Sequence, residues 1–365
     1  MLEGLRIIEI EALGPAPFAA MMLADLGADV IVVHRKHGQP APGMPERSVI
    51  DRGKRSIELD LKSAADVTVL KQLVGRSEAL IEGFRPGVME RLGLGPQDLM
   101  RVNPDLVYGR MTGWGQTGPR AQTAGHDLNY VSLSGAAWYA GNAGEPPLTP
   151  PTLVGDIGGG ALYLVAGILS GVLAARAGRG GTVVDAAIVD GSAHMMNLLM
   201  ALAQTGGLAT ARGRSLLDGP HWSRCYACAD GGFMSVQCLE PKFYDAFLSL
   251  MGLSEDPDFT HQFDIDAWPK QTARLAGIFV AQPRAHWENL FEGSDACVAP
   301  ALDPRSSASD QHMAARGVWR EIDGVFQAAP APRFSTGPER TSRPLPARGE
   351  HSAEILGWLE SDNQG

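Results

Sequence analysis

The sequence is poor in cysteine and has no surplus of basic residues. Four cysteines in 365 residues are too few for a disulfide framework. The formal net charge of −10 excludes a general nucleic-acid-binding protein, which would carry an excess of lysine and arginine. The N-terminal stretch MLEGLRIIEIEALG has acids within its apolar part and lacks the long apolar segment of a secretory signal. These absences predict a cytoplasmic protein.

A dinucleotide fingerprint is also missing. Residues 5–10, 15–27 and 28–33 predict a strand, a helix with proline in its first turn, and a second strand. The loop after the first strand, EALGPAP, lacks G-x-G-x-x-G, and the second strand ends in His34 instead of an acid that would hold a ribose hydroxyl. We therefore predict an α/β, Rossmann-like fold with a parallel sheet and without a nicotinamide site.

The chain is long enough for two domains. Alternating strands and helices predict a large α/β domain at residues 1–200, and a linker with a smaller α+β domain is predicted at 201–329. Five prolines between residues 330 and 346 predict an extended arm, followed by a helix at 351–360. We expect residues 330–365 to complete the large domain.

One apolar run, Ile157–Ala175, has 19 residues and no charge, which is long enough to span a bilayer. It is a single run, rich in glycine, and Asp156 and Arg176 flank it directly. We therefore predict a buried helix of the large domain and no membrane span.

Two clusters could carry chemistry. Seven basic and four acidic side chains lie between residues 34 and 62, and arginine and lysine bind phosphates through charge-assisted hydrogen bonds. A solvated basic face would have the same composition. Cys225 and Cys228 form a C-x-x-C pair with Cys238 nearby, but a structural zinc site needs four regularly spaced ligands. We predict buried thiols and no metal site.

Two further candidates are single polar residues in glycine-rich surroundings. His126 and Asp127 follow a Gly/Pro-rich loop, the kind of place where α/β sheets bind ligands and a histidine can transfer protons. A loop histidine that bonds the backbone is the more common alternative. Asp156 precedes three glycines and could simply cap a helix, although the glycines indicate a close approach to the backbone.

Several stretches together carry a family resemblance: RGKRSIELDLK, IEGFRPGVMERLGLGP, MTGWGQTGP, AGHDLNY, VGDIGGG, VVDAAIVDGS and GEHSAEILGWL. They resemble the family III CoA-transferase superfamily, and AGHDLNY and VGDIGGG are most similar to its α-methylacyl-CoA racemase branch. The match covers residues 2 to about 200 and continues less closely to the end. It implies an isomerase of lipid metabolism that interconverts (R) and (S) 2-methylacyl-CoA thioesters through an enolate. It also implies an interlocked homodimer that needs no cofactor, because coenzyme A is part of the substrate.

The resemblance also implies roles for individual residues. His126 matches the catalytic base, Asp156 the opposing aspartate, and Glu240 the glutamate that holds the histidine across the dimer interface. Contacts with the acyl-CoA are implied for Arg35, Lys36, Leu59, Asp60, Leu61, Lys62, Gly83, Phe84, Arg85, Arg91, Gly125, Asp127 and Tyr130. Inversion needs one group to remove a proton while the other returns one. We expect amides of the glycine-rich helix start to stabilise the enolate oxygen.

Two departures from the racemase pattern bear on the substrate. Gly38 stands where the racemases carry an arginine near the phosphates, so Arg35 or Lys36 is expected to replace it. The segment GPHWSRCY, residues 219–226, is also different and is expected near the acyl channel.

The alternatives are a CoA-transferase with Asp127 as nucleophile and a CoA-ester-binding protein without activity. The histidine before Asp127 argues against the transferase.

Overall fold

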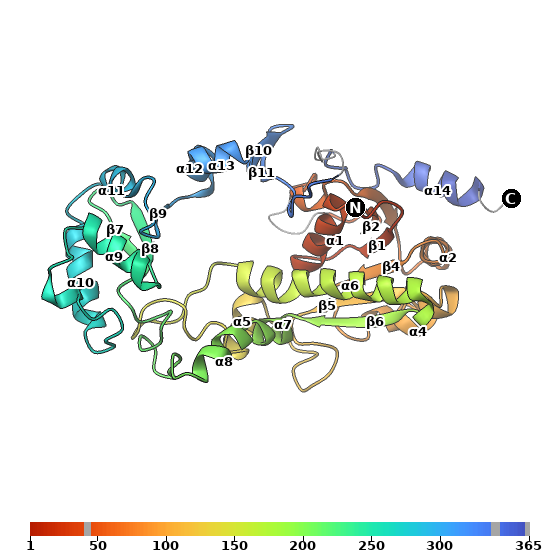
Figure 1. Cartoon of the computed structure of the whole chain (residues 1–365). Coiled ribbons are helices and arrows are strands. Elements are labelled where there is room, and N and C mark those ends of the chain that lie inside the picture. The colour runs from red at the N-terminus through yellow and green to blue at the C-terminus, as the bar shows by residue number, and fades with distance from the viewer. Residues whose placement is uncertain (40–44, 337–343, 362–365) are drawn as a thin grey trace. The chain divides into compact units, whose positions relative to one another are not determined.

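The computed structural model describes residues 1–39, 45–336 and 344–361 (Figure 1). The chain divides into two compact units. The first consists of residues 1–136, 150–195 and 317–365, and the second of residues 137–149 and 196–316. Part of the predicted extended arm, residues 337–343, lies outside the described residues.

A parallel sheet forms the centre of the first unit, in the order β3-β2-β1-β4-β5-β6. Its strands are β1 (Arg6–Ile10), β2 (Asp29–Arg35), β3 (Arg55–Leu59), β4 (Ala79–Glu82), β5 (Val107–Thr112) and β6 (Thr182–Ala187). The predicted α/β class and β-α-β unit are confirmed. The strand order reverses between β1 and β4, and open α/β sheets bind ligands at such a reversal, outside the carboxyl ends of the strands.

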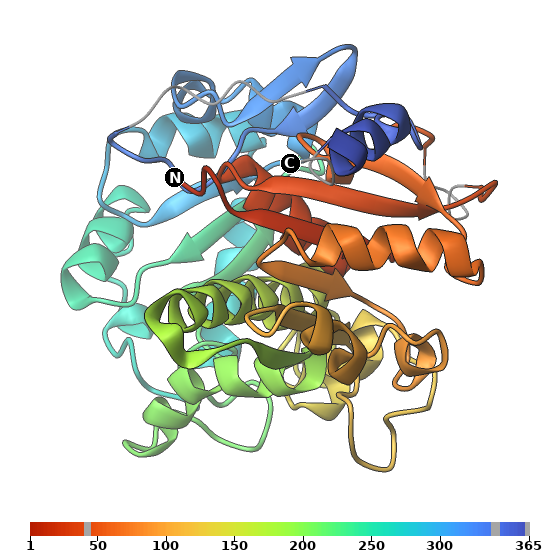
Figure 2. The same cartoon turned by 90° about the vertical axis from the view of Figure 1, so that its right-hand side faces the viewer.

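Helices cover both faces of this sheet (Figures 1 and 2). One face packs against α1 (Pro15–Asp25) and α6 (Leu162–Ala174), and the other against α2 (Ala64–Val74), α4 (Pro96–Val102) and α14 (Ser352–Ser361). Each face of the sheet has its own apolar core. Successive residues of β1 point to opposite faces, so that Ile7 packs in the first core and Ile8 in the second. This two-faced burial explains why the central strands are apolar throughout.

The long apolar run belongs to a helical segment of the first unit. A π-helix, Leu153–Ala161, continues into α6, and the whole segment Leu153–Arg179 is long and apolar enough to cross a membrane by composition. Two glycines of α6 lie directly on the sheet. A Cβ on Gly167 would meet Val184 at 2.4 Å, and one on Gly171 would meet Val107 at 2.7 Å. This face packs closely on β5 and β6, whereas Leu162 and Leu173 are exposed, so the prediction of a buried helix is right for one face only.

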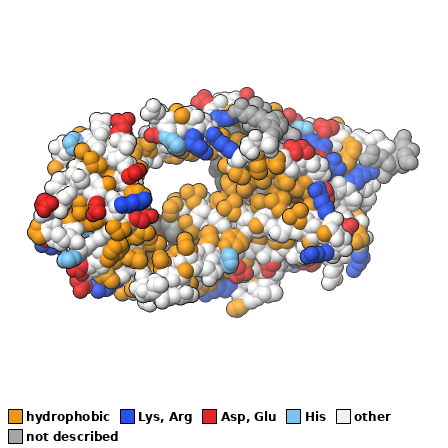
Figure 3. Space-filling model, in the orientation of Figure 1, with side chains coloured by type: hydrophobic (Ala, Val, Ile, Leu, Met, Phe, Trp, Pro, Cys, Tyr) orange, Lys and Arg blue, Asp and Glu red, His pale blue; other side chains and the backbone are white. Residues whose placement is uncertain are grey.

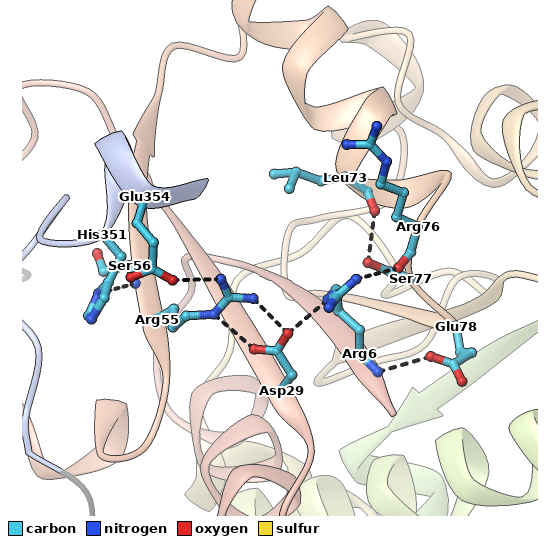
Figure 4. Close-up of polar contacts among 10 residues, drawn as sticks. All are labelled: Arg6, Asp29, Arg55, Ser56, Leu73, Arg76, Ser77, Glu78, His351 and Glu354. Carbon is cyan, nitrogen blue, oxygen red and sulfur yellow. Dashed lines mark hydrogen bonds and ion pairs between the residues drawn. The ribbon is translucent and has the colours of Figure 1, made fainter. Parts of the chain in front are cut away.

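Polar contacts hold the C-terminal helix α14 to the sheet (Figure 4). Arg55 on β3 donates to Asp29 at 2.6 Å and to Glu354 of α14 at 3.1 Å. The backbone N–H of Ser56 donates to His351 Nδ1 at 3.1 Å. These contacts place Ile355 and Leu359 in the second core, and they confirm the predicted closing helix.

The second unit contains an antiparallel sheet of β7 (Ser223–Ala227), β8 (Phe233–Gln237) and β9 (Val298–Ala301). Helices α9 (Pro241–Leu250), α10 (Trp268–Phe279) and α11 (Arg284–Phe291) share its apolar core, so the predicted α+β class is confirmed.

The remaining elements of the two units are α3 (Val88–Arg91), α5 (Asp127–Leu133), α7 (Ile188–Met195), α8 (Asn197–Ala203), α12 (Pro304–Ala308), α13 (Gln311–Ala315), β10 (Trp319–Ile322) and β11 (Val325–Ala328), with single turns of 3-10 helix at Val49–Asp51 and Pro257–Phe259.

Candidate active site

Two cavities of the first unit lie at the strand-order reversal. The larger, of about 630 Å³, is lined by residues that follow β1, β2, β3 and β4 and by Arg348 of the C-terminal segment. The smaller, of about 360 Å³, is lined by the loops after β4 and β5 and includes His126. Leu13, Gly83 and Phe84 line both cavities. The two cavities therefore meet at these three residues, and we call them together the track.

Most of the residues implied to contact acyl-CoA line this track. The larger cavity is lined by Arg35, Leu59, Asp60, Leu61, Lys62, Gly83 and Phe84. The smaller cavity is lined by Gly83, Phe84, Arg85, Gly125 and Tyr130, together with the implied base His126. Three others line neither cavity. Lys36 lies 3.9 Å from Asp66, Arg91 is exposed on α3, and Asp127 is buried at the start of α5.

Most of the basic cluster between residues 34 and 62 forms ion pairs within the chain, which neither a phosphate-binding group nor a solvated basic face describes. Arg52 pairs with Asp25 and Arg55 with Asp29. Lys54 is fully buried and contacts Glu9 at 2.6 Å. Burial raises the pKa of Glu9 to about 7 although Lys54 lowers it. Arg35 and Lys62 remain as the cluster's contribution to the cavity wall.

His126 lies immediately before α5, at the smaller cavity. The backbone fixes this position, since the N–H of His126 donates to Asn129 Oδ1 at 3.0 Å and its carbonyl accepts the N–H of Asn129 at 2.8 Å. Its side chain is exposed. The Tyr130 hydroxyl donates to the Gly125 carbonyl, and the ring leaves no space for a side chain at Gly113, whose Cβ would lie 1.9 Å from it. The loop is thus rigid around an accessible imidazole.

Asp156 lies inside the π-helix, so the expectation that the helix begins after it is wrong. The helix begins at Leu153, and Thr152 precedes it with a left-handed φ of 61°. Asp127 organises this start: its Oδ1 accepts the N–H of Asp156 at 2.9 Å and its Oδ2 accepts the N–H of Thr152 at 3.2 Å. π-Helical turns of this kind are frequent at functional sites.

The carboxyl group of Asp156 is tuned by its surroundings. Burial, followed by the negative charge of Asp127, raises its pKa to about 6, while His126 lowers it. Its Oδ2 lies 3.6 Å from the position that a Cβ on Gly14 would occupy, beside the N-terminus of α1. A carboxyl group with this pKa can both take and give a proton near neutral pH.

The glycines on either side of Asp156 serve packing within the chain. A Cβ on Gly155 would lie 2.4 Å from Asp127 Oδ1, and one on Gly159 would lie 2.4 Å from Ser192 Oγ of α7. The close approach that the glycine-rich sequence indicates is therefore made by Asp127 and by α7.

Two backbone amides of the π-helix, at Asp156 and Ile157, are also engaged within the chain. The N–H of Asp156 donates to Asp127 Oδ1, and the N–H of Ile157 donates to the Thr152 carbonyl at 3.0 Å. Of the amides after Asp156 that we expect to stabilise an enolate oxygen, that of Ile157 is therefore not free.

Several cavity residues carry no local signal in the sequence. Glu11 and Leu13 follow β1 at the strand-order reversal, a position that only the sheet order identifies. Trp114 lines the smaller cavity and packs edge-on against Tyr130, with ring centroids 4.7 Å apart. Arg348 reaches the larger cavity from the far end of the chain, and no local pattern marks it.

The second unit contains the other predicted residues. Glu240 is exposed and immediately precedes α9. In the segment 219–226, His221, Trp222 and Tyr226 are buried in the core of this unit, so these three side chains serve packing. Arg224 donates to the carbonyls of Asp218 and Pro220, each at 3.3 Å.

The cysteines are free thiols. Cys228 and Cys238 are buried as predicted, whereas Cys225 is exposed, so the prediction is wrong for that residue. Among the residues that the structure describes, no group of three or more His, Cys, Asp or Glu side chains is arranged to hold a metal ion.

Comparisons with known proteins agree with this geometry. Residues 2–352 match the family model described as CoA-transferase family III. The chain is 38% identical to the α-methylacyl-CoA racemase of Mus musculus over 98% of its own length and 92% of the relative's. It is 39% identical to the Homo sapiens racemase, over 97% and 92% of the two chains. A crystal structure of a CAIB/BAIF family protein from Brucella suis superposes with a TM-score of 0.82 at 26% identity, covering 98% of this chain and 99% of the other.

Proposed function

The chain belongs to CoA-transferase family III, and we propose that it interconverts the (R) and (S) forms of a 2-methylacyl-CoA thioester by 1,1-proton transfer. The observation that carries this proposal is an accessible His126 at the smaller cavity whose charge acts on Asp156, where burial and Asp127 raise the pKa to about 6. One group removes a proton and becomes protonated while the other gives up its proton. After a turnover, each group is therefore in the state in which the other began. The two together would hold one proton between turnovers.

The two cavities would hold different parts of the substrate. The larger cavity would hold the nucleotide end of coenzyme A, and Gly83 and Phe84 would guide the pantetheine toward His126. Glu82 fixes this turn, because its Oε2 accepts the N–H of Phe84 at 2.7 Å while its Oε1 accepts from Arg110 at 3.0 Å. His126 and Asp156 would remove and return the proton on the α carbon. General acid–base catalysis of this kind contributes about 10²- to 10⁴-fold.

A transferase mechanism is less well supported. Both oxygens of Asp127 accept backbone hydrogen bonds and the residue is buried, so its carboxylate is engaged in holding the π-helix. It also lines neither cavity, so a thioester bound along the track would not reach a nucleophile at this position. Incubation with an acyl-CoA and a free acid distinguishes the two reactions, since only a transferase exchanges the acyl group.

Incubation with a 2-methylacyl-CoA in deuterated water tests the proposal. The wild-type protein should incorporate deuterium at the α carbon and lose the stereochemistry of the substrate. His126→Ala and Asp156→Ala should each abolish interconversion. His312→Ala and Asp105→Ala are matched controls, because both side chains are exposed and line neither cavity. The absence of deuterium uptake with every 2-methylacyl-CoA would refute the proposal.

We also propose a cytoplasmic homodimer that acts in lipid metabolism. Exposed apolar side chains support the dimer: Leu162 and Leu173 of α6 are 43% and 69% exposed, and Figure 3 shows hydrophobic side chains gathered over α1 and α6. Light scattering measures the oligomeric state.

In such a dimer, Glu240 of one chain would hold His126 of the other. Mixing His126→Ala chains with Glu240→Gln chains should then restore part of the activity, because a mixed dimer has one intact pair. No recovery in a verified mixed dimer would exclude the contact between chains.

A further inference from the structure

Arg348 is a cationic residue of the larger cavity that the proposed mechanism does not use. Its guanidinium donates to both carboxylate oxygens of Glu11, with Nη2 at 3.0 Å from Oε2. Nη2 also lies 3.3 Å from the carbonyl oxygen of Arg35. The side chain is 11% exposed and lines the cavity together with Arg35 and Lys62.

One donor of this guanidinium is unused. The Nε atom of Arg348 is buried and has no acceptor among the described residues. A buried donor without a partner destabilises a fold, so a fold seldom retains one without a reason. The guanidinium as a whole borders the cavity, together with Arg35 and Lys62.

Glu11 supplies a counter-charge in the unliganded protein. Burial works against its ionisation, but hydrogen bonds from Arg348 and from the backbone of Arg35 outweigh this and hold the pKa of Glu11 below its usual value. The carboxylate is thus ionised at neutral pH, and it accepts hydrogen bonds from both Nη atoms of Arg348.

The fold holds Arg348 in place from the C-terminal side. The next residue, Gly349, donates its N–H to Ser56 Oγ at 2.8 Å, and His351 donates its N–H to the Ser56 carbonyl at 2.9 Å. Figure 4 shows the neighbouring contact between Ser56 and His351. Gly38 leaves room for the guanidinium, since a Cβ there would lie 2.9 Å from Nη2.

We propose that Arg348 binds a phosphate group of the coenzyme A moiety and that Glu11 holds the guanidinium until the phosphate replaces part of its hydrogen bonds. The planar fork of arginine matches phosphate oxygens, and hydrogen bonds between charged groups are the strongest kind available here. This inference rests on the proposed function, because it takes coenzyme A as the ligand. The 3′-phosphate and the diphosphate offer the same chemistry.

Calorimetric titration with coenzyme A tests the inference without requiring turnover. Arg348→Gln should bind about 10- to 100-fold more weakly than the wild type, the usual loss for one charge-assisted hydrogen-bonding group. Glu11→Gln should bind at least as tightly, because it removes the competing carboxylate. The control is Arg47→Gln. Arg47 donates to the Leu345 carbonyl and pairs with Glu350, so it anchors the same segment without lining the cavity.

A second titration with 3′-dephospho-coenzyme A identifies the phosphate. If Arg348 binds the 3′-phosphate, wild type and Arg348→Gln should bind this ligand equally; if it binds the diphosphate, the variant should still bind more weakly. Equal affinity of wild type and Arg348→Gln for coenzyme A would overturn the inference, as would equal losses in Arg348→Gln and Arg47→Gln. Failure of the wild type to bind coenzyme A would instead count against the proposed function.

Discussion

The carboxylate of Asp127 accepts the backbone N–H of Asp156 at 2.9 Å, although the two residues lie on different helices. Its other oxygen accepts the N–H of Thr152 at 3.2 Å. A single buried side chain therefore sets where the π-helix begins and where the carboxyl group of Asp156 lies. The same negative charge raises the pKa of Asp156. Asp127 is thus a positioning residue for the proposed proton transfer.

Replacing Asp127 by asparagine should lower both stability and exchange activity. The asparagine oxygen can keep one of the two backbone hydrogen bonds, while its amide faces the other donor, and a buried unsatisfied group costs about 1–3 kcal/mol. We expect deuterium exchange to fall by about tenfold or more if Asp156 shifts by a fraction of an ångström. Denaturant titration and exchange rates measure the two effects. Acyl transfer in the wild type that disappears in this variant would show that the carboxylate is a nucleophile instead.

The pH dependence should report the raised pKa of Asp156. In the direction of racemisation in which Asp156 takes the proton, kcat/KM should fall as the pH drops through about 6, because protonation removes the base. In Asp127→Asn the midpoint should move to lower pH, since the charge that raises this pKa is gone. Initial rates of both enantiomers between pH 4 and 9, at roughly unit intervals, measure the midpoints. An unchanged midpoint in Asp127→Asn would contradict the electrostatic account.

Gly191→Ala should destabilise the first unit strongly. A Cβ at this position would lie 1.9 Å from the Gly159 carbonyl oxygen, so α7 and the π-helix must separate. Overpacking of this kind costs about 1–3 kcal/mol or more. Gly357→Ala in α14 is the control: nothing lies within 4 Å of its Cβ, and alanine favours the helix by about 0.5–1 kcal/mol. Thermal unfolding of both variants gives the comparison, and equal stability would rule out the close contact.

Asp29→Asn should destabilise the protein by about 1–2 kcal/mol at neutral pH. The loss is not larger because Asp29 is only half-buried and solvent screens its charge. Hydrogen bonds and charge from Arg55 and Arg6 outweigh burial and lower the pKa of Asp29. A lowered pKa adds stability above the ordinary aspartate value of about 3.9, and this stability is lost as the pH falls toward the folded value. The difference between wild type and variant should therefore shrink in acid. A difference that stays constant from neutral pH to pH of about 3 would contradict this linkage.

Local patterns predict the first strands and helices well. Residues 5–10, 15–27 and 28–33 correspond to β1, α1 and β2, because apolar runs with Pro and Gly at their ends are local signals. The strand β3 escapes such prediction. Three of its five residues, RSIEL, are polar, and the strand depends on pairing with β2, where His34 lies beside Glu58.

The parts of the site that escape prediction depend on contacts between distant residues. The π-helix starts three residues before Asp156 because Asp127 binds its amides, and the two are 29 positions apart. The basic residues Arg52 and Lys54 are neutralised by Asp25 and Glu9, which belong to earlier elements. Composition alone cannot distinguish such pairs from a phosphate site. The residues at the strand ends are predictable only through the family resemblance.

The ion pair between Glu11 and Arg348 joins positions 337 residues apart in the sequence. During synthesis, the strands of the parallel sheet are all present once residue 187 has been made, but one wall of the larger cavity is not. A nascent chain, or one cleaved before position 348, would have every strand of the parallel sheet but lack one wall of the proposed nucleotide pocket. Retention on immobilised coenzyme A would then separate full-length chains from truncated ones.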